Sequence, residues 1–180
     1  KIFELSISAW EQYTDELPNV ANAWLATAKR LRSQVAITDS SGSALTHRRV
    51  ATAVFLLSEV LAKRCREQNI GLLMPATSAG AITNLAVLNC CKTVVNLNYT
   101  ASVENVQRAI DKAEIKHLIT SKKFLDKLEA RGIRLDGLVG VRFLLLEDVF
   151  DQMPKWKRLA MLSLVSLLPT DLLQRFFHRS

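Results

Sequence analysis

The stretch NLNYTASVENVQRAIDKAEIKHLITS, residues 96–121, contains the end of one strand, a complete helix and a second strand. Ser102 is a residue type that caps helix N-termini, and Glu104 follows where the positive end of a helix favours a carboxylate. Apolar residues then recur at the spacing of one helical face: Val103, Val106, Ile110 and Ala113. The sequence HLIT at residues 117–120 is short, apolar and typical of a buried strand. This order of elements predicts two parallel strands joined by a crossover helix.

The same alternation continues on both sides of this stretch. Residues 34–38 and 43–46 flank the turn sequence DSSG and predict a hairpin, and Thr46 can cap the helix that follows. That helix is expected to bury one face, formed by Val50, Val54, Leu57 and Leu61. Further strands are predicted at residues 70–75, 93–98 and 141–148, and further helices at residues 79–91 and 122–130.

The alternation predicts an α/β fold, with a mostly parallel sheet and helices on both of its faces. We expect Val94, Val95 and Leu97 in a central strand, between strands at residues 72–74 and 118–119. Three segments are predicted along the chain. They are a lead-in and helix at residues 1–33, the α/β subdomain at residues 34–150, and an apolar and basic helical segment at residues 151–180.

The composition indicates a globular protein. Hydrophobic residues make up 49% of the 180 residues and charged residues 23%, which excludes a disordered chain. The net charge of +7 is dispersed, and this favours a basic surface or an anionic partner but not nucleic acid. Cys65, Cys90 and Cys91 lack metal-ligand spacing, and adjacent cysteines rarely form a disulfide. We expect reduced thiols in the core.

The sequence shows no complete catalytic constellation. His47, His117 and His178 belong to different predicted elements, and an isolated histidine is usually structural or solvated. Glu147 and Asp148 end a predicted strand, at the edge where parallel sheets bind ligands. Neighbours on a strand point to opposite faces, however, and so cannot serve one site. Serine-hydrolase, zinc-protease and Walker-type motifs are absent from the sequence. We predict no catalytic, cofactor-binding or metal-binding residue.

The segment MPKWKRLAMLSLVSLLPTDLLQRFFHRS, residues 153–180, differs from the rest of the chain. Its apolar run is shorter than the ~20 residues that a membrane-spanning helix needs. One interpretation is a helix packed on the sheet or on another part of the protein. The other is an interfacial helix whose apolar residues enter lipid while basic residues meet anionic headgroups. Membrane contact is assigned to Lys155, Trp156, Lys157, Arg158, Leu159, Leu162, Leu164, Val165 and Leu168.

Several short sequence motifs occur along the chain in an order that is similar to that of a known family. The series begins with the pattern Asp-x-x-Gly-x-x-Leu-Thr at residues 39–46, continues with a Gly-to-Pro strand at residues 71–75, and ends with the strands VVNLN and LITS. Over residues 20–170 the chain resembles the opening segment of the adenylate-forming superfamily of acyl synthetases. Asn96-Leu97-Asn98-Tyr99 stands where most members have Pro-Leu-Asn-Pro. Together with FLDK, LEDV and the lysine-flanked apolar insertion, it resembles the branch of bifunctional 2-acylglycerophosphoethanolamine acyltransferase/acyl-(acyl-carrier-protein) synthetases.

The resemblance implies a Rossmann or flavodoxin-like N-terminal subdomain of an AMP-binding domain. It also implies a parent protein that uses ATP and Mg²⁺ to convert a fatty acid into an acyl-adenylate. The acyl group then passes to acyl carrier protein and finally to a lysophospholipid. The implied place of this parent is the cytoplasmic face of the bacterial inner membrane.

In this superfamily the phosphate-binding loop and an assisting lysine lie beyond the region that the chain covers. The resemblance therefore places no functional residue in the chain, which we expect to be soluble, to bind no cofactor and to be inactive by itself. Two alternatives remain open. One is a fragment of a fatty acyl-CoA synthetase or another adenylate-forming ligase, and the other is a non-catalytic flavodoxin-like binding module.

Overall fold

The computed structural model describes residue 7, residues 19–39, residue 42 and residues 44–177 of the chain. Most of the predicted lead-in, at residues 1–18, and His178 lie outside the described residues. The described part contains an antiparallel hairpin of β1 (Val35–Thr38) and β2 (Ala44–Thr46) and a separate four-stranded sheet. The hairpin is placed as the sequence predicts.

The four-stranded sheet is parallel throughout. Its strands are β3 (Asn69–Leu72), β4 (Thr93–Asn96), β5 (His117–Thr120) and β6 (Arg142–Leu145), in the spatial order β4-β3-β5-β6. Gly71 is paired on both sides, with Val95 in β4 and Leu118 in β5. A Cβ atom at Gly71 would lie 2.8 Å from Leu118 Cδ1 and 2.9 Å from Ile115 Cγ2, so a larger residue would force these side chains to shift. The predicted parallel α/β fold is confirmed.

The strand order corrects one prediction. Val94 and Val95 lie in β4, which is the edge strand, and β3 takes the central position between β4 and β5. The two valines are half-buried, whereas Ile70 in β3 is completely buried. A β-branched sequence is compatible with a central strand and with an edge strand. The order of the strands is decided by the direction of each crossover, which the sequence of a strand does not specify.

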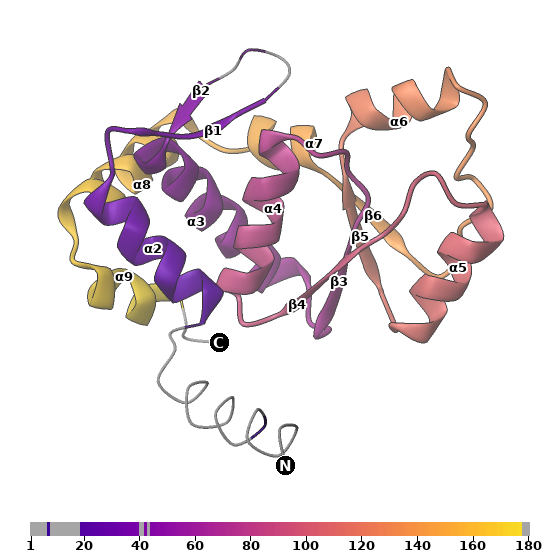
Figure 1. Cartoon of the computed structure of the whole chain (residues 1–180), viewed down its shortest axis with the longest axis horizontal. Helices are drawn as coiled ribbons and strands as arrows, with labels where there is room; N and C mark the ends of the chain where they lie inside the picture. The colour runs from indigo at the N-terminus through magenta and orange to yellow at the C-terminus, as the bar shows by residue number, and fades with distance from the viewer. Residues whose placement is uncertain (1–6, 8–18, 40–41, 43, 178–180) are drawn as a thin grey trace.

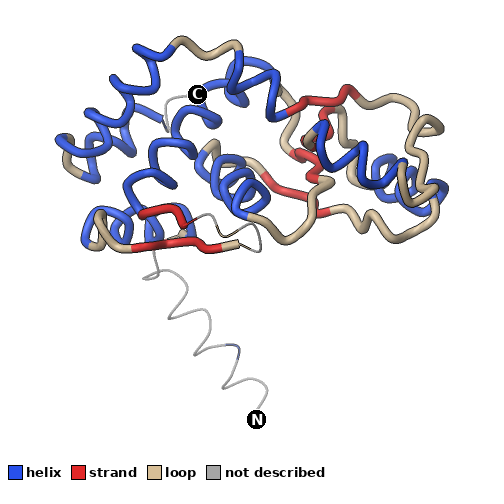
Figure 2. The backbone as a smooth tube through the Cα atoms, turned by 90° about the horizontal axis from the view of Figure 1, so that it is seen from above, coloured by secondary structure: helices blue, strands red, loops and turns tan. Residues whose placement is uncertain are grey.

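Helices cover both faces of the sheet. The helix α4 (Ser78–Asn89), which joins β3 to β4, lies on one face together with α3 (His47–Arg64), while α5 (Val103–Lys112) and α6 (Lys122–Glu129) lie on the other (Figure 1). The tube in Figure 2 shows the same layering from above. Side chains alternate accordingly along the strands. Ile70, Leu72 and Ile119 join the apolar cluster around α3, and Leu73 and Leu118 join the cluster around α5 and α6.

Helix α3 is the centre of the larger cluster. Thr46 caps it by accepting a hydrogen bond from Arg49 N, and Val50, Val54, Leu57 and Leu61 are completely buried, as predicted. Helix α4 packs on α3 from one side. The helices α2 (Val20–Arg30), α8 (Lys155–Leu167) and α9 (Thr170–Phe177) pack on it from others.

The structure also shifts several element ends. The strand predicted at residues 70–75 ends at Leu72, and the strand predicted at residues 141–148 is only β6, which ends at Leu145. A short helix, α7 (Leu146–Asp151), follows β6 directly. Glu147 and Asp148 therefore lie in the first turn of a helix and not on a strand.

Candidate functional site

The chain reverses direction across the sheet between β3 and β5. From β3 it passes through α4 to β4 on one side, and it then returns through α5 to β5 on the other side of β3. The loops that leave β3 and β5 therefore diverge toward opposite faces and open a crevice at the carboxyl ends of these strands. Open α/β sheets bind their ligands at such a reversal.

Hydrogen bonds hold the two strands together at this point. Leu73 N donates to Ile119 O at 2.9 Å, one residue beyond the end of β3. The Thr120 hydroxyl donates to Leu73 O at 2.8 Å, and the threonine side chain is completely buried. These bonds fix the floor of the crevice.

One wall of the crevice is the start of α4. Thr77 caps this helix by accepting from Gly80 N, and a Cβ atom at Gly80 would lie 2.9 Å from the carbonyl oxygen of Pro75. Asp39, at the end of β1, accepts hydrogen bonds from Ser78 Oγ at 2.6 Å and from Ser78 N at 3.3 Å. A carboxylate thus lies at the positive end of α4, and its negative charge opposes phosphate binding at that end.

Two hollows flank this loop. One, of about 640 Å³, extends over α4 toward β4 and reaches Asn84 and Asn96, which hydrogen-bond to each other. The other, of about 530 Å³, lies beyond the carboxyl ends of β3, β5 and β6. Asp39, Met74, Pro75, Thr77 and Ser78 line both hollows. We call the second hollow the switch-point cleft.

The switch-point cleft has an apolar lining with charged groups beside it. Met74, Phe124, Leu146 and Phe150 supply apolar surface. Lys123 and Lys127 supply positive charge, whereas Asp39, Glu147 and Asp151 supply negative charge. The apolar surface fits a ligand with an apolar chain, whereas the charged groups of both signs do not by themselves select an anionic ligand. Among the described residues that line this cleft, we find no group of metal ligands.

Glu147 and Asp148 converge on one residue, Lys122, contrary to the expectation that they point apart. Glu147 accepts from Lys122 N at 2.9 Å, and Asp148 forms an ion pair with the Lys122 ammonium group. The hydrogen bond that the Lys122 ammonium group donates to Asp148 raises the pKa of Lys122 above its ordinary value. The prediction that the two acids point apart is wrong because they begin the helix α7 and do not lie on a strand, and from there both contact the start of α6.

The residues assigned to membrane contact lie on different faces of α8. Val165, which was assigned to membrane contact, is buried against the core together with Met161, and Leu162 and Leu168 are half-buried. Trp156 is 69% exposed, Leu159 65%, Leu164 42% and Leu167 81%. The exposed residues recur at intervals of three to five and form one apolar stripe along the outer face of the helix. We call these four residues the α8 stripe. None of the helices in the described part is long and apolar enough to cross a membrane.

Basic residues fasten α8 to the rest of the protein. Lys157 Nζ lies 2.8 Å from Glu59 Oε1 in α3, and the Arg158 guanidinium donates to the carbonyl of Phe150. At the other end of α8, Lys29 Nζ donates to Val165 O at 2.7 Å. Burial alone would raise the pKa of Glu59, but hydrogen bonds and charges from Lys157 and Lys63 outweigh burial and lower this pKa below its ordinary value. Lys155 at the start of α8 is exposed.

A second polar group lies at the opposite, amino-terminal edge of the sheet. His117 Nδ1 is 2.6 Å from Glu67 Oε1, and Cys65 lies beside this pair. Burial raises the pKa of the Cys65 thiol to about 12. None of the three cysteines forms a disulfide, but the expectation of core thiols is wrong for Cys91, which is exposed. Cys91 follows the end of α4 with a φ of 54°, and this left-handed turn directs it out of the core.

No protein-family model matches the chain. Among solved structures, the chain is similar to the amide bond synthetase McbA from Marinactinospora thermotolerans, with 26% identity over 70% of the chain and a TM-score of 0.57. It is also similar to the nonribosomal peptide synthetase FmoA3 in its alpha-methyl-L-serine-AMP bound form, with 17% identity over 75% of the chain and a TM-score of 0.63. A third similar structure is a fatty acyl CoA synthetase of Mycobacterium tuberculosis, with 14% identity over 73% of the chain and a TM-score of 0.59.

These three neighbours are adenylate-forming enzymes. The chain has the fold of the N-terminal subdomain of such enzymes. It spans only 26% of the amide bond synthetase, 15% of the nonribosomal peptide synthetase and 28% of the acyl CoA synthetase.

Proposed function

We propose that the chain is the opening part of a ligase that activates a fatty acid as an acyl-adenylate and transfers the acyl group to acyl carrier protein. The observation that carries the proposal is the switch-point cleft, which lies at the ligand edge of a sheet with the fold of adenylate-forming enzymes. ATP and Mg²⁺ are assigned to parts of the parent protein outside these 180 residues. This agrees with Asp39, which already occupies the positive end of α4.

The chemistry of the cleft supports a fatty acid as the ligand of this segment. Its apolar lining matches an acyl chain. Lys123 and Lys127 can attract the carboxylate of the fatty acid, and they must outweigh the repulsion from Asp39, Glu147 and Asp151 in the same lining. A volume of about 530 Å³ lies within the ~300–1,000 Å³ usual for small-molecule sites. We assign to Phe150 contact with the acyl chain and to Lys123 attraction of the anionic end.

The test uses the parent protein and measures fatty-acid-dependent exchange between ATP and pyrophosphate. Phe150→Ala is expected to raise the KM for the fatty acid, because it removes apolar lining from the cleft. Phe143→Ala is the matched control, since Phe143 is 40% exposed and lies outside the switch-point cleft. Equal kinetic constants for wild type and Phe150→Ala would exclude the cleft as the acyl site.

The proposed acyl-carrier-protein synthetase and the alternative, a fatty acyl-CoA synthetase, differ in the molecule that accepts the acyl group. Acyl carrier protein is favoured by the net charge of +7, because a basic surface attracts an acidic partner. Similarity to a fatty acyl CoA synthetase favours coenzyme A instead. Parallel assays with both acceptors decide between them. Faster transfer to coenzyme A would favour the alternative.

The proposed final acceptor is a lysophospholipid, 2-acylglycerophosphoethanolamine, at the cytoplasmic face of the inner membrane. The α8 stripe supports this part of the proposal, because an exposed tryptophan and leucines beside the exposed Lys155 suit the surface of an anionic bilayer. The stripe would rest in the interfacial layer while Met161 and Val165 keep α8 on the core.

Co-sedimentation with vesicles tests this contact. Replacing Trp156 and Leu159 together by serine is expected to abolish most binding to vesicles that contain anionic lipid, because it removes the apolar contact. Val139→Ser, which changes another exposed apolar residue (67% exposed), serves as the control. If the double variant sediments as well as wild type, α8 makes no membrane contact.

A further inference from the structure

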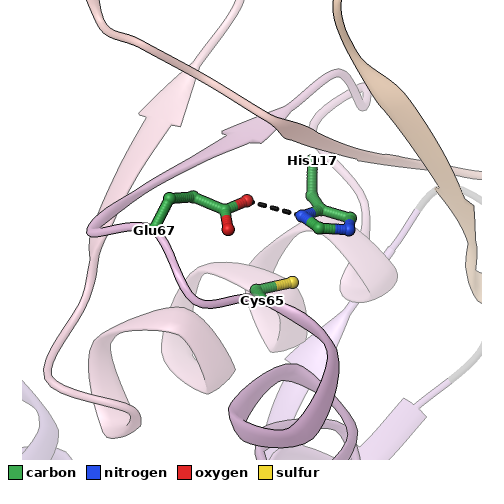
Figure 3. Close-up of side chains that lie close together, drawn as sticks. All are labelled: Cys65, Glu67 and His117. Atoms are coloured by element: carbon green, nitrogen blue, oxygen red, sulfur yellow. Dashed lines mark hydrogen bonds and ion pairs between the residues drawn. The ribbon is translucent and has the colours of Figure 1, made fainter.

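Three side chains of different metal-ligand types meet at the amino-terminal edge of the sheet. Cys65 offers a sulfur, Glu67 a carboxylate oxygen and His117 an imidazole nitrogen, and these three atoms all lie within 4.8 Å of one another (Figure 3). Cys65 is buried at 1% exposure, and the side chains of Glu67 and His117 are 8% and 15% exposed. The group is thus nearly enclosed, with access to solvent on the side of the histidine.

The fold holds each ligand from a different place. Cys65 is the C-cap of α3, where its N–H donates to Leu61 O, and Glu67 follows two residues later in the loop to β3. His117 is the first residue of β5, 50 positions farther along the chain. The loop is braced because the Lys92 ammonium group donates to the carbonyl of Glu67 at 2.6 Å. The three ligands are therefore held by the end of α3, a braced loop and the start of β5, which reduces the loss of conformational entropy when a metal binds.

We propose that Cys65, Glu67 and His117 bind a zinc ion, with a water molecule as the fourth ligand. One sulfur, one nitrogen and one oxygen form a set that suits Zn²⁺ and does not suit Mg²⁺ or Ca²⁺, which prefer oxygen ligands. Tetrahedral coordination places ligand atoms ~3.3–3.6 Å apart, given zinc–ligand bonds of ~2.0–2.3 Å. The three atoms already lie within 4.8 Å of one another, and Glu67 Oε1 and His117 Nδ1, now 2.6 Å apart, would have to separate to reach this geometry.

The charges balance when the ion binds. The thiol of Cys65 gives up its proton to solvent, so that one thiolate and one carboxylate neutralise the double charge of zinc. Burial and the neighbouring Glu67 carboxylate oppose this loss by raising the pKa of the thiol, and the zinc ion offsets them because a coordinated thiol is deprotonated. Cys90 lies nearby, but its thiol donates to the carbonyl of Ser58, which leaves the fourth position to water.

The position of the site indicates a structural role. It joins the end of α3, the loop before β3 and the start of β5, at the edge of the sheet opposite to the switch-point cleft. Zinc at this position would fasten β5 to α3, and it would not contact a ligand in the cleft. The proposal is independent of the function assigned to the cleft.

The test titrates cobalt(II) as a zinc analogue into the reduced, tag-free 180-residue chain after removal of metals. We expect one equivalent to bind, with the visible bands of four-coordinate cobalt and a sulfur-to-cobalt charge-transfer band, and we expect zinc to displace it. Cys65→Ser is expected to lose the charge-transfer band, whereas Cys91→Ser, which changes the exposed neighbouring thiol, should keep it. His117→Gln is expected to weaken cobalt binding by ~100-fold or more, since loss of outer partners alone weakens metal binding 10–100-fold.

X-ray absorption of the zinc-loaded wild-type chain gives a measurement that needs no variant. One sulfur at ~2.3 Å and light atoms at ~2.0 Å are expected. The proposal is overturned if no sulfur is found in the zinc shell. It is equally overturned if the charge-transfer band survives Cys65→Ser, or if Cys91→Ser abolishes it.

Discussion

The replacement Thr120→Val isolates one hydrogen bond at the floor of the switch-point cleft. The side chain is completely buried, and its hydroxyl donates to Leu73 O at 2.8 Å. Valine has nearly the same shape, so the change removes the donor without leaving a cavity. Leaving a buried acceptor without its partner lowers the free energy of unfolding by about 1–3 kcal/mol. For a domain of this size each kcal/mol lowers the Tm by about 2–4 °C.

Thr83→Val provides a matched control for this prediction. Thr83 is also completely buried, and its hydroxyl donates to Ala79 O at 2.8 Å. That carbonyl still accepts the N–H bond within α4, so the loss of the hydroxyl leaves no buried acceptor without a partner. Urea unfolding and thermal melts of both variants measure the difference. Equal stability of the two variants, or a larger loss for Thr83→Val, would refute the reasoning that Thr120→Val leaves the carbonyl of Leu73 buried without a partner.

The 180-residue chain by itself is expected to show no fatty-acid-dependent ATP–pyrophosphate exchange, because its sequence contains no phosphate-binding loop; exchange above that of a boiled sample would contradict this. Ile70→Asp should destabilise the protein by several kcal/mol more than Val95→Asp, since Ile70 is completely buried in the central strand and Val95 is half-buried at the edge; urea unfolding ranks the two. The folded-state pKa of Glu59 lies below its ordinary value of 4.5, so its ion pair with Lys157 stabilises the fold above this pH, and the stabilisation is lost as the pH falls through the lowered pKa. Unfolding curves of wild type and Glu59→Gln should therefore differ at neutral pH, begin to converge as the pH falls past 4.5 and meet below the lowered pKa; a constant difference would exclude this ion pair as the cause.

Much of the local structure could be predicted from the sequence, because neighbours along the chain decide it. Ser102 and Thr46 cap their helices as expected, since each side chain reaches an N–H three residues away. The buried face of α3 followed from the helical period alone. The parallel fold class followed from the alternation of strands and helices.

The candidate site depended on contacts that sequence spacing does not encode. The central position of β3 arises from the direction of two crossovers, and this direction decides where the cleft opens. The convergence of Glu147 and Asp148 on Lys122 arises because α7 begins directly after β6. Because α7 begins at Leu146, Glu147 and Asp148 are helical, and the prediction that they point to opposite faces of a strand does not hold.

The sequence by itself determined the elements, their caps and their apolar faces, because these depend on residues at most a few positions apart. Only the tertiary structure decided which polar groups meet. Cys65 and Glu67 lie about 50 positions from His117, and Lys29 lies 136 positions from the Val165 carbonyl that it binds. The outward direction of the α8 stripe was likewise decided by which face of α8 packs on α3. Which face of a helix is buried depends on the other helix or strand that packs against it, and the position of that element follows from the path of the whole chain.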